Sequence, residues 1–348
     1  MNLFALVLRA PSTVPRRGLE PLVQVPPVAG SSAILPSVTR ASLSTGTGWS
    51  ELASCAMTAQ EGGADWLDRR EYPFAPRYFT TPVGRLHYID EGAGRPIVFV
   101  HGNPVWSFLY RNQIKALSAE HRCIAPDHIG FGLSDKPRDW TYLPAQHATH
   151  LEALLESMDL HDLTLVIGDW GGPIGIAYAL RHPDRVRAVV VSNTWMWSVS
   201  SQLKFRLFSG FVGGPIGRYQ IRSRNSFADS GLRGAFGDSR RLSPAIHQQY
   251  LRPFAVPDER KGSWVLPKQI IASSPWLEDL WTRRAVLQGK RFLFLWGMKD
   301  PGFGRKELGR WTQQYPSGRV IQYPDGGHFV AEEKSAEFTA ELAAFERS

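Results

Sequence analysis

Short apolar runs alternate with helical patterns along the chain from residue 65 onward. Each run is bounded by Gly, Pro or polar residues and is rich in branched or aromatic side chains, which is typical of strands. Strands are predicted at 77–81, 85–90, 96–100, 121–125, 163–167, 186–192, 291–295 and 319–323. Helical spacing of apolar residues predicts helices at 146–158 and 171–181. Strands that are apolar on both faces and alternate with helices indicate an α/β fold with a mainly parallel sheet, covered on both sides.

This alternation stops between Trp195 and Lys290. The intervening stretch is rich in Arg, Phe, Trp, Gly and Ser and is too long for a structureless loop in a compact domain. We therefore predict a helical cap at 195–289, inserted into a core formed by 65–194 and 290–348. Such a cap is expected to lie over the strand ends, where open α/β sheets bind their ligands.

The N-terminal segment differs in composition from the rest of the chain. It contains Arg, Ser and Pro with few acidic residues, which faintly resembles an organellar transit peptide, but it has no sustained periodicity. We expect residues 1–60 to be a disordered extension or an upstream start assignment. Met57 would be a natural start, because the pattern of a folded domain begins just after it.

Composition and charge narrow the possible functions. The chain has 348 residues, is 43% hydrophobic and 21% charged, and carries a net charge of +8 that is spread along its length. The sequence has no run of Lys and Arg interleaved with aromatic residues, which is the pattern that would suggest nucleic-acid binding. No apolar run approaches the length of a membrane span. The two cysteines, Cys55 and Cys123, fit free thiols in a reducing compartment, so we expect a cytoplasmic protein with no membrane partner. No metal-binding motif is found, and no metal or cofactor is expected.

The strand at 163–167 leads into a turn that contains Asp169, Trp170, Gly171 and Gly172. This is the position at which α/β-hydrolases carry their nucleophile, usually a serine. A carboxylate is already ionised at neutral pH and could displace a leaving group from a saturated carbon, forming an ester. The alternative is that Asp169 merely caps the following helix.

Two further residues follow the last two predicted strands. His328 lies in a Gly-Gly-His turn after the strand at 319–323, and Asp300 follows the strand at 291–295. Each could be structural, since a lone histidine or an aspartate before a proline often belongs to a turn. However, the order nucleophile, acid and histidine (Asp169, Asp300, His328) is the order of the α/β-hydrolase fold.

A third motif, His101-Gly102-Asn103-Pro104, follows the strand at 96–100. Its backbone could contribute an N–H to an oxyanion hole. The side-chain amide of Asn103 could donate a hydrogen bond to an anion.

Together these motifs resemble the haloalkane dehalogenases of the α/β-hydrolase superfamily. The resemblance runs from about Asp65 to the C-terminus and also includes Gly130-Phe-Gly-Leu-Ser-Asp-Lys-Pro137. It implies an α/β-hydrolase core with an eight-stranded, mostly parallel sheet. In this family, the acidic residue that pairs with the histidine follows either of two strands. The earlier position, around Asn193, offers no carboxylate, so Asp300 is the expected acid, as in the family's third subfamily.

The resemblance also implies a mechanism without a cofactor. Asp169 would displace halide from an alkyl carbon, and His328, oriented by Asp300, would activate the water that hydrolyses the ester. Asn103 and Trp170 would bind the halide through their side chains and form the oxyanion hole through their backbone N–H groups. The implied reaction converts a halogenated aliphatic compound to a primary alcohol and halide. Aromatic residues of the cap could line the substrate pocket: Trp195, Trp197, Phe205, Phe208 and Trp276.

Two other functions remain open at this point. An epoxide hydrolase would share the Asp nucleophile and would need two cap tyrosines as acid, for which Tyr219 and Tyr250 are available. Asn103 argues against it, because those enzymes resemble His-Gly-Phe/Trp-Pro at this motif. The third reading is a non-catalytic, ligand-binding protein on a hydrolase scaffold.

Overall fold

The computed structural model describes residues 65–348, so the predictions for residues 1–60 lie outside the described part. Its centre is an eight-stranded sheet with strand order β1-β2-β4-β3-β5-β6-β7-β8. The pairs β1–β2 and β2–β4 are antiparallel, and the other five pairs are parallel. The strands are β1 (Arg77–Thr81), β2 (Gly84–Glu91), β3 (Pro96–Val100), β4 (Arg122–Pro126), β5 (Leu163–Gly168), β6 (Val186–Ser192), β7 (Arg291–Gly297) and β8 (Arg319–Tyr323).

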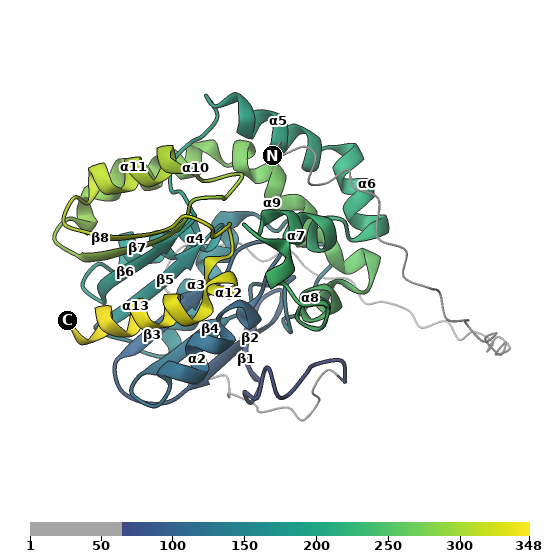
Figure 1. The fold of residues 1–348 in the computed structure, drawn as a ribbon. Coiled ribbons are helices and arrows are strands. Elements are labelled where there is room, and N and C mark those ends of the chain that lie inside the picture. Colours follow the sequence, from purple (N-terminus) through teal and green to yellow (C-terminus); the bar gives the residue numbers. More distant parts are fainter. Residues whose placement is uncertain (1–64) are drawn as a thin grey trace, which may run out of the picture. The chain divides into compact units, whose positions relative to one another are not determined.

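Successive residues of the central strands point into two separate cores. Val98 and Val100 of β3 belong to one buried cluster, whereas Ile97 and Phe99 belong to the other. The same alternation holds in β6 and β7, because side chains alternate between the two faces of a strand. The first cluster is filled by helices α3 and α4, and the second by α2 and α13, which lie on the opposite side of the sheet (Figure 1). Burial on both faces explains why these strands are almost continuously apolar.

The helices of the core are α2 (Arg111–Leu117), α3 (Pro144–Ser157), α4 (Gly171–Arg181), α11 (Arg305–Gln314), α12 (Val330–Glu333) and α13 (Ser335–Arg347), with the short η2 (Ser107–Tyr110). Both predicted helices are present, and α4 has the predicted bounds. Helix α3 starts at Pro144 instead of residue 146, because proline is well suited to the first turn of a helix.

The chain between β6 and β7 is helical. It contains α5 (Leu203–Val212), α6 (Pro215–Arg224), η3 (Phe227–Gly231), α7 (Leu232–Ala235), η4 (Ser239–Arg241), α8 (Pro244–Leu251), η5 (Arg252–Phe254), η6 (Pro257–Arg260), α9 (Lys261–Ala272), α10 (Ser274–Thr282) and η7 (Arg283–Leu287). We call this segment the helical insertion. Much of it lies beyond one end of the sheet (Figure 1). Helix α10 instead packs beside α4, so the last part of the insertion joins the core.

Within residues 65–348, no helix is long and apolar enough to cross a membrane. The buried Cys123 of β4 is a free thiol.

Candidate active site

Asp169 occupies a strained turn between β5 and α4. Its φ of 48° is left-handed, a conformation that costs a non-glycine residue about 1–3 kcal/mol. Three backbone contacts hold the turn: the Asp169 N–H donates to Asn193 O, and its carbonyl accepts from Thr194 Oγ1 and from the Gly172 N–H. The carboxylate accepts no hydrogen bond from the first turn of α4. The helix-capping alternative is therefore wrong, and the turn points the carboxylate away from the helix.

Two glycines leave room for this turn. A Cβ at Gly102 would lie 2.3 Å from the Cβ of Asp169, and a Cβ at Gly171 would lie 2.0 Å from the Val100 carbonyl oxygen. Both distances are far inside van der Waals contact. The glycines in the two motifs thus allow β3, the turn and α4 to approach one another closely.

His328 lies between two carboxylates. Its Nδ1 donates to Asp300 Oδ2 at 2.7 Å, and its Nε2 lies 3.3 Å from Asp169 Oδ2. The second oxygen of Asp300 accepts from the Gly302 N–H at 2.7 Å. The Asp300 side chain is completely buried and both of its oxygens accept hydrogen bonds, so it can orient the imidazole.

Burial lowers the pKa of His328, but the charge of Asp300 and the hydrogen bonds to Asp169 and Asp300 outweigh it. They raise the pKa to about 10. The ring therefore carries a proton at neutral pH. When Asp169 loses its charge, two of the contributions that raise this pKa disappear, so the same ring becomes able to accept a proton.

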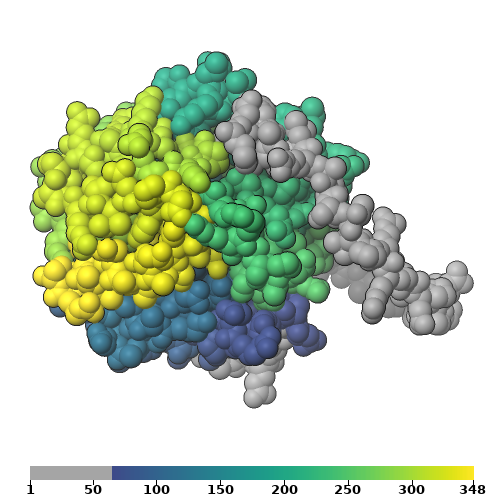
Figure 2. Space-filling model, viewed as in Figure 1, coloured from purple at the N-terminus to yellow at the C-terminus, as the bar shows by residue number. Residues whose placement is uncertain are grey.

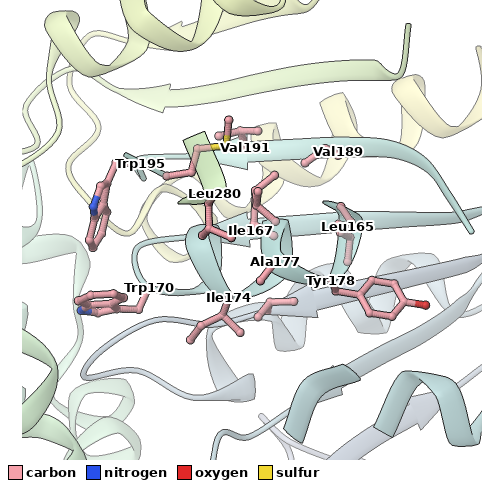
Figure 3. Packing of buried hydrophobic residues seen from close by; sticks show 14 of the residues in the cluster. Leu165, Ile167, Trp170, Ile174, Ala177, Tyr178, Val189, Val191, Trp195 and Leu280 are labelled. Atoms are coloured by element: carbon pink, nitrogen blue, oxygen red, sulfur yellow. The ribbon is translucent and has the colours of Figure 1, made fainter. Parts of the chain in front are cut away.

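Asn103 and Trp170 present donors beside Asp169. The Asn103 backbone N–H donates to Asp169 Oδ1 at 2.7 Å, and one side-chain N–H donates to the Ser263 carbonyl of α9 at 3.2 Å. The amide nitrogen has a second N–H left for a ligand. Trp170 packs edge-on against Trp195, and Figure 3 shows the two indoles beside each other at one end of the buried cluster. Among residues 65–348, the Trp170 indole N–H has no hydrogen-bond acceptor.

A cavity of about 90 Å³ joins these five side chains. Asn103, Asp169, Trp170, Asp300 and His328 all line it. The rest of its wall is mainly apolar and comes from the helical insertion and from the loops after β7 and β8: Phe205, Phe208, Phe227, Leu232, Pro267, Ile270, Phe303 and Phe329.

The predicted aromatic residues of the cap are divided between this cavity and ordinary packing. Phe205 and Phe208 line it. Trp195 lies behind Trp170, stacked on Phe303, and is fully buried. Trp197 packs against Trp281 and Trp311 and lines a different hollow, and Trp276 packs against the core. These three tryptophans are therefore not part of the cavity wall, because their bulk fills the space between the helices and the sheet.

Both tyrosines considered for epoxide opening lie away from the cavity. Tyr219 is exposed on α6, and Tyr250 is buried with its hydroxyl donating to Glu332. Neither lines the cavity, and no tyrosine does. The acid that an epoxide hydrolase needs is thus missing from this wall.

Sequence reasoning missed Asn193 as a member of the site. Its side-chain N–H groups donate to Asp300 Oδ2 and Gly297 O, both at 2.9 Å, and its backbone carbonyl accepts from Asp169. Asn193 therefore ties the Asp169 turn to the Asp300 loop. The sequence carries one signal for this role, a polar residue at the end of an apolar strand.

Within the described residues, no group of three or more His, Cys, Asp or Glu side chains could hold a metal ion.

The similarity of this chain to known proteins identifies its family. The family model described as the alpha/beta hydrolase fold matches residues 95–335. Haloalkane dehalogenase 2 of Mycobacterium tuberculosis is 39% identical over 270 residues, covering 76% of this chain and 93% of the relative. A cis-3-alkyl-4-alkyloxetan-2-one decarboxylase of Shewanella oneidensis is 34% identical over 78% of this chain and 88% of its own length.

Solved structures agree with these relatives. The haloalkane dehalogenase DatA of Agrobacterium tumefaciens matches with a TM-score of 0.70 at 28% identity, covering 78% of this chain and 96% of that one. The expected fold, an α/β-hydrolase core with an inserted helical cap, is confirmed. The chain belongs to the haloalkane dehalogenases of the α/β-hydrolase superfamily.

Proposed function

We propose that the protein hydrolyses haloalkanes to a primary alcohol, halide and a proton through an ester on Asp169. The observation that carries this proposal is an apolar cavity lined by a carboxylate nucleophile, a buried His–Asp pair and two N–H donors that have no acceptor among residues 65–348. The haloalkane dehalogenases among the relatives support it.

In the first step, Asp169 Oδ2 attacks the carbon that carries the halogen. We assign the attack to Oδ2 because Oδ1 accepts the short 2.7 Å bond from the Asn103 N–H, whereas Oδ2 has only the longer 3.3 Å contact with His328 Nε2. The carbon–halogen bond breaks as the carbon–oxygen bond forms, and the electron pair leaves with the halide. The free N–H of Asn103 and the indole N–H of Trp170 stabilise this developing negative charge, and the apolar wall strengthens both interactions.

In the second step, water attacks the carbonyl carbon of the ester. Esterification removes the charge of Asp169, which lowers the pKa of His328, so that Nε2 releases its proton to solvent and can then take the proton from water. Asp300 holds the ring and stabilises the imidazolium that forms. The Asn103 and Trp170 backbone N–H groups support the oxyanion on Oδ1. Collapse of this intermediate breaks the bond between the carboxyl carbon and Oδ2, and the His328 imidazolium protonates the departing alkoxide to give the alcohol. The carboxyl group left on Asp169 then loses its proton to His328, which restores the carboxylate.

The cavity favours short, apolar substrates. Its volume of about 90 Å³ is below the roughly 300–1,000 Å³ that is usual for small-molecule pockets. The apolar wall offers no charged group to bind the remote end of a substrate.

Halide release from bromobutane and dibromoethane tests the proposal directly. We expect turnover with both, and no turnover with styrene oxide, since the cavity lacks a tyrosine acid. Carbon dioxide release from a cis-dialkyl β-lactone is measured in parallel, because one group of relatives carries that activity in its name. Hydrolysis of styrene oxide or decarboxylation of the lactone, without halide release, would contradict dehalogenation. A correctly folded protein that acts on none of these compounds would indicate the non-catalytic alternative.

We also propose that the protein acts in the cytoplasm. The support is its buried free thiol at Cys123, which needs no oxidising compartment. Fractionation of the source cells would test it, and recovery in an extracytoplasmic fraction would contradict it.

A further inference from the structure

The outer face of the helical insertion concentrates exposed apolar side chains. Seven large apolar residues are exposed in residues 65–348, and four of them lie on α5 and α6. These are Leu203, Leu207, Ile216 and Tyr219, with exposed fractions of 64%, 47%, 60% and 69%. Clustering of this kind is uncommon on a surface that faces only water.

The same two helices are basic and contain no acid. The chain has no aspartate or glutamate between Asp184 and Asp229, and α5 and α6 carry five Lys or Arg residues. Two of these five form ion pairs, Lys204 with Glu307 and Arg222 with Asp258. The positive charge of the others is not neutralised by any carboxylate in the described residues.

A shallow groove of about 840 Å³ brings the cations together with aromatic residues. It runs between α5, α6 and α9. Arg206, Arg218 and Lys268 line it, and none of the three pairs with a carboxylate in the part of the chain described. The guanidinium of Arg218 lies 4.3 Å from the ring of Trp264, which is also in the lining. We call this groove and the flanking Leu203, Leu207, Ile216 and Tyr219 the α5–α6 face.

We propose that the α5–α6 face docks on the surface of an anionic lipid bilayer. Unpaired Lys and Arg attract anionic headgroups, and exposed Leu, Ile and Tyr side chains can enter the boundary between headgroups and acyl chains. Nucleic acid would use the cations but would leave the exposed aliphatic residues in water. Docking of this kind requires no helix that spans the membrane, so it is compatible with the absence of such a helix from the described residues, but it departs from the expectation of no membrane partner drawn from the sequence.

Helix α5 connects this face to the active-site cavity. Its Phe205 and Phe208 line the cavity, whereas Leu203 and Leu207 are exposed. Figure 1 shows α5 and α6 on the side of the insertion that faces away from the sheet, and the teal atoms at the top of Figure 2 belong to this region. A docked enzyme would therefore receive apolar compounds that dissolve in the bilayer close to its cavity. This last consequence rests on the proposed function, whereas docking does not.

Co-sedimentation of the full chain with vesicles tests the docking. We expect binding to vesicles of phosphatidylcholine and phosphatidylserine, weakening with added salt, and little binding to phosphatidylcholine alone. Each cation near an anionic surface contributes about fivefold to the partition coefficient. The variant R206Q/R218Q/K268Q should therefore bind about a hundredfold more weakly.

The matched control is R77Q/R252Q/R347Q, which removes the same charge from three exposed residues of β1, η5 and α13. It should bind the mixed vesicles within a few-fold of the unmodified chain. A second variant, L203A/L207A/I216A, should also bind more weakly, because it removes apolar surface without changing charge.

Three results would overturn the proposal: no binding to the mixed vesicles, equal binding to both kinds of vesicle, or equal losses in the groove and control variants. Binding to polyglutamate but not to vesicles would assign the face to an acidic protein instead, and would also overturn it. All variants should keep the halide-release rate in solution, which shows that they are folded. Vesicle binding without any dehalogenation would contradict the proposed function and leave the docking intact.

Discussion

The strand ends and the helical insertion contribute to the same cavity, but they hold their residues in different ways. At the strand ends, Asp169, Asp300 and His328 are each fixed by directed hydrogen bonds. The insertion contributes mainly apolar contacts, and its few polar links to the strand-end residues include the bond from the Asn103 side chain to the Ser263 carbonyl and the bond from the His328 backbone N–H to the Ala235 carbonyl. Directed bonds fix atoms to within a few tenths of an ångström, whereas apolar contacts fix a volume. The comparison therefore assigns the chemistry to the strand ends and the choice of substrate to the insertion.

The largest effect is expected from Asp169→Asn. It removes the nucleophilic oxygen while keeping the size of the side chain, and asparagine also tolerates a left-handed backbone. Steady-state halide release should fall by a factor on the order of 10⁴ or more. Asp159→Asn is the control, because Asp159 has a similar φ of 46° but lies on the surface. Comparable losses in both variants would indicate a fold defect instead of a lost nucleophile.

A smaller loss is expected from Trp170→Phe, which keeps an aromatic ring and removes the indole N–H. Removing one donor from a developing anion typically costs about 10²-fold in turnover. The measurement is halide release with bromide and chloride substrates, together with bromide binding. Trp195→Phe is the matched control, since its indole N–H is buried without an acceptor and does not line the cavity. If Trp195→Phe weakened bromide binding and Trp170→Phe did not, the halide donor would be wrongly assigned.

A substitution in the insertion should change the substrate preference without changing the chemical steps. Phe208→Leu enlarges the cavity, so the ratio of kcat/KM values for longer and shorter bromoalkanes should shift by up to about tenfold. Phe211→Leu, on the same helix but outside the cavity wall, should leave the ratio unchanged. A fall in kcat to the level of Asp169→Asn would break the division between the two regions.

The smallest effect concerns the pH dependence of stability. The pKa of His328 is raised to about 10 in the folded protein, so the folded state holds this proton more tightly than the unfolded chain. Its contribution is fully present below about pH 6.5 and is lost as the pH rises through about 10. Asp169→Asn removes part of the cause, so its free energy of unfolding should decline less steeply across this range. Parallel urea-unfolding curves for the two proteins would contradict this assignment.

The central strands could be predicted from the sequence because they are buried on both faces, which makes each a nearly unbroken apolar run. The pattern of β6 (Val186–Ser192), for example, has no other plausible reading at that length. The three residues at strand ends, Asp169, Asp300 and His328, followed from the order of motifs along the chain.

The cavity wall was harder to predict, because Trp195 and Phe208 have equivalent sequence contexts but opposite roles. Whether an aromatic residue lines a cavity or fills a core depends on how the helices pack, and no local sequence pattern indicates how they will pack. The bond from Asn103 to Ser263 was equally hard to predict, because its acceptor is a backbone carbonyl, which every residue has. Asn193 could have been found by asking what holds a buried carboxylate in place.

The central claim is that Asp169 forms an ester which only His328 can hydrolyse. Rapid mixing of His328→Phe with bromobutane, followed by intact-protein mass spectrometry, tests it most directly. We predict a burst of bromide equal to the amount of enzyme, no further turnover, and a mass increase of one butyl group on the peptide that contains Asp169. Continued turnover past the burst, or a burst without the added mass, would contradict the mechanism.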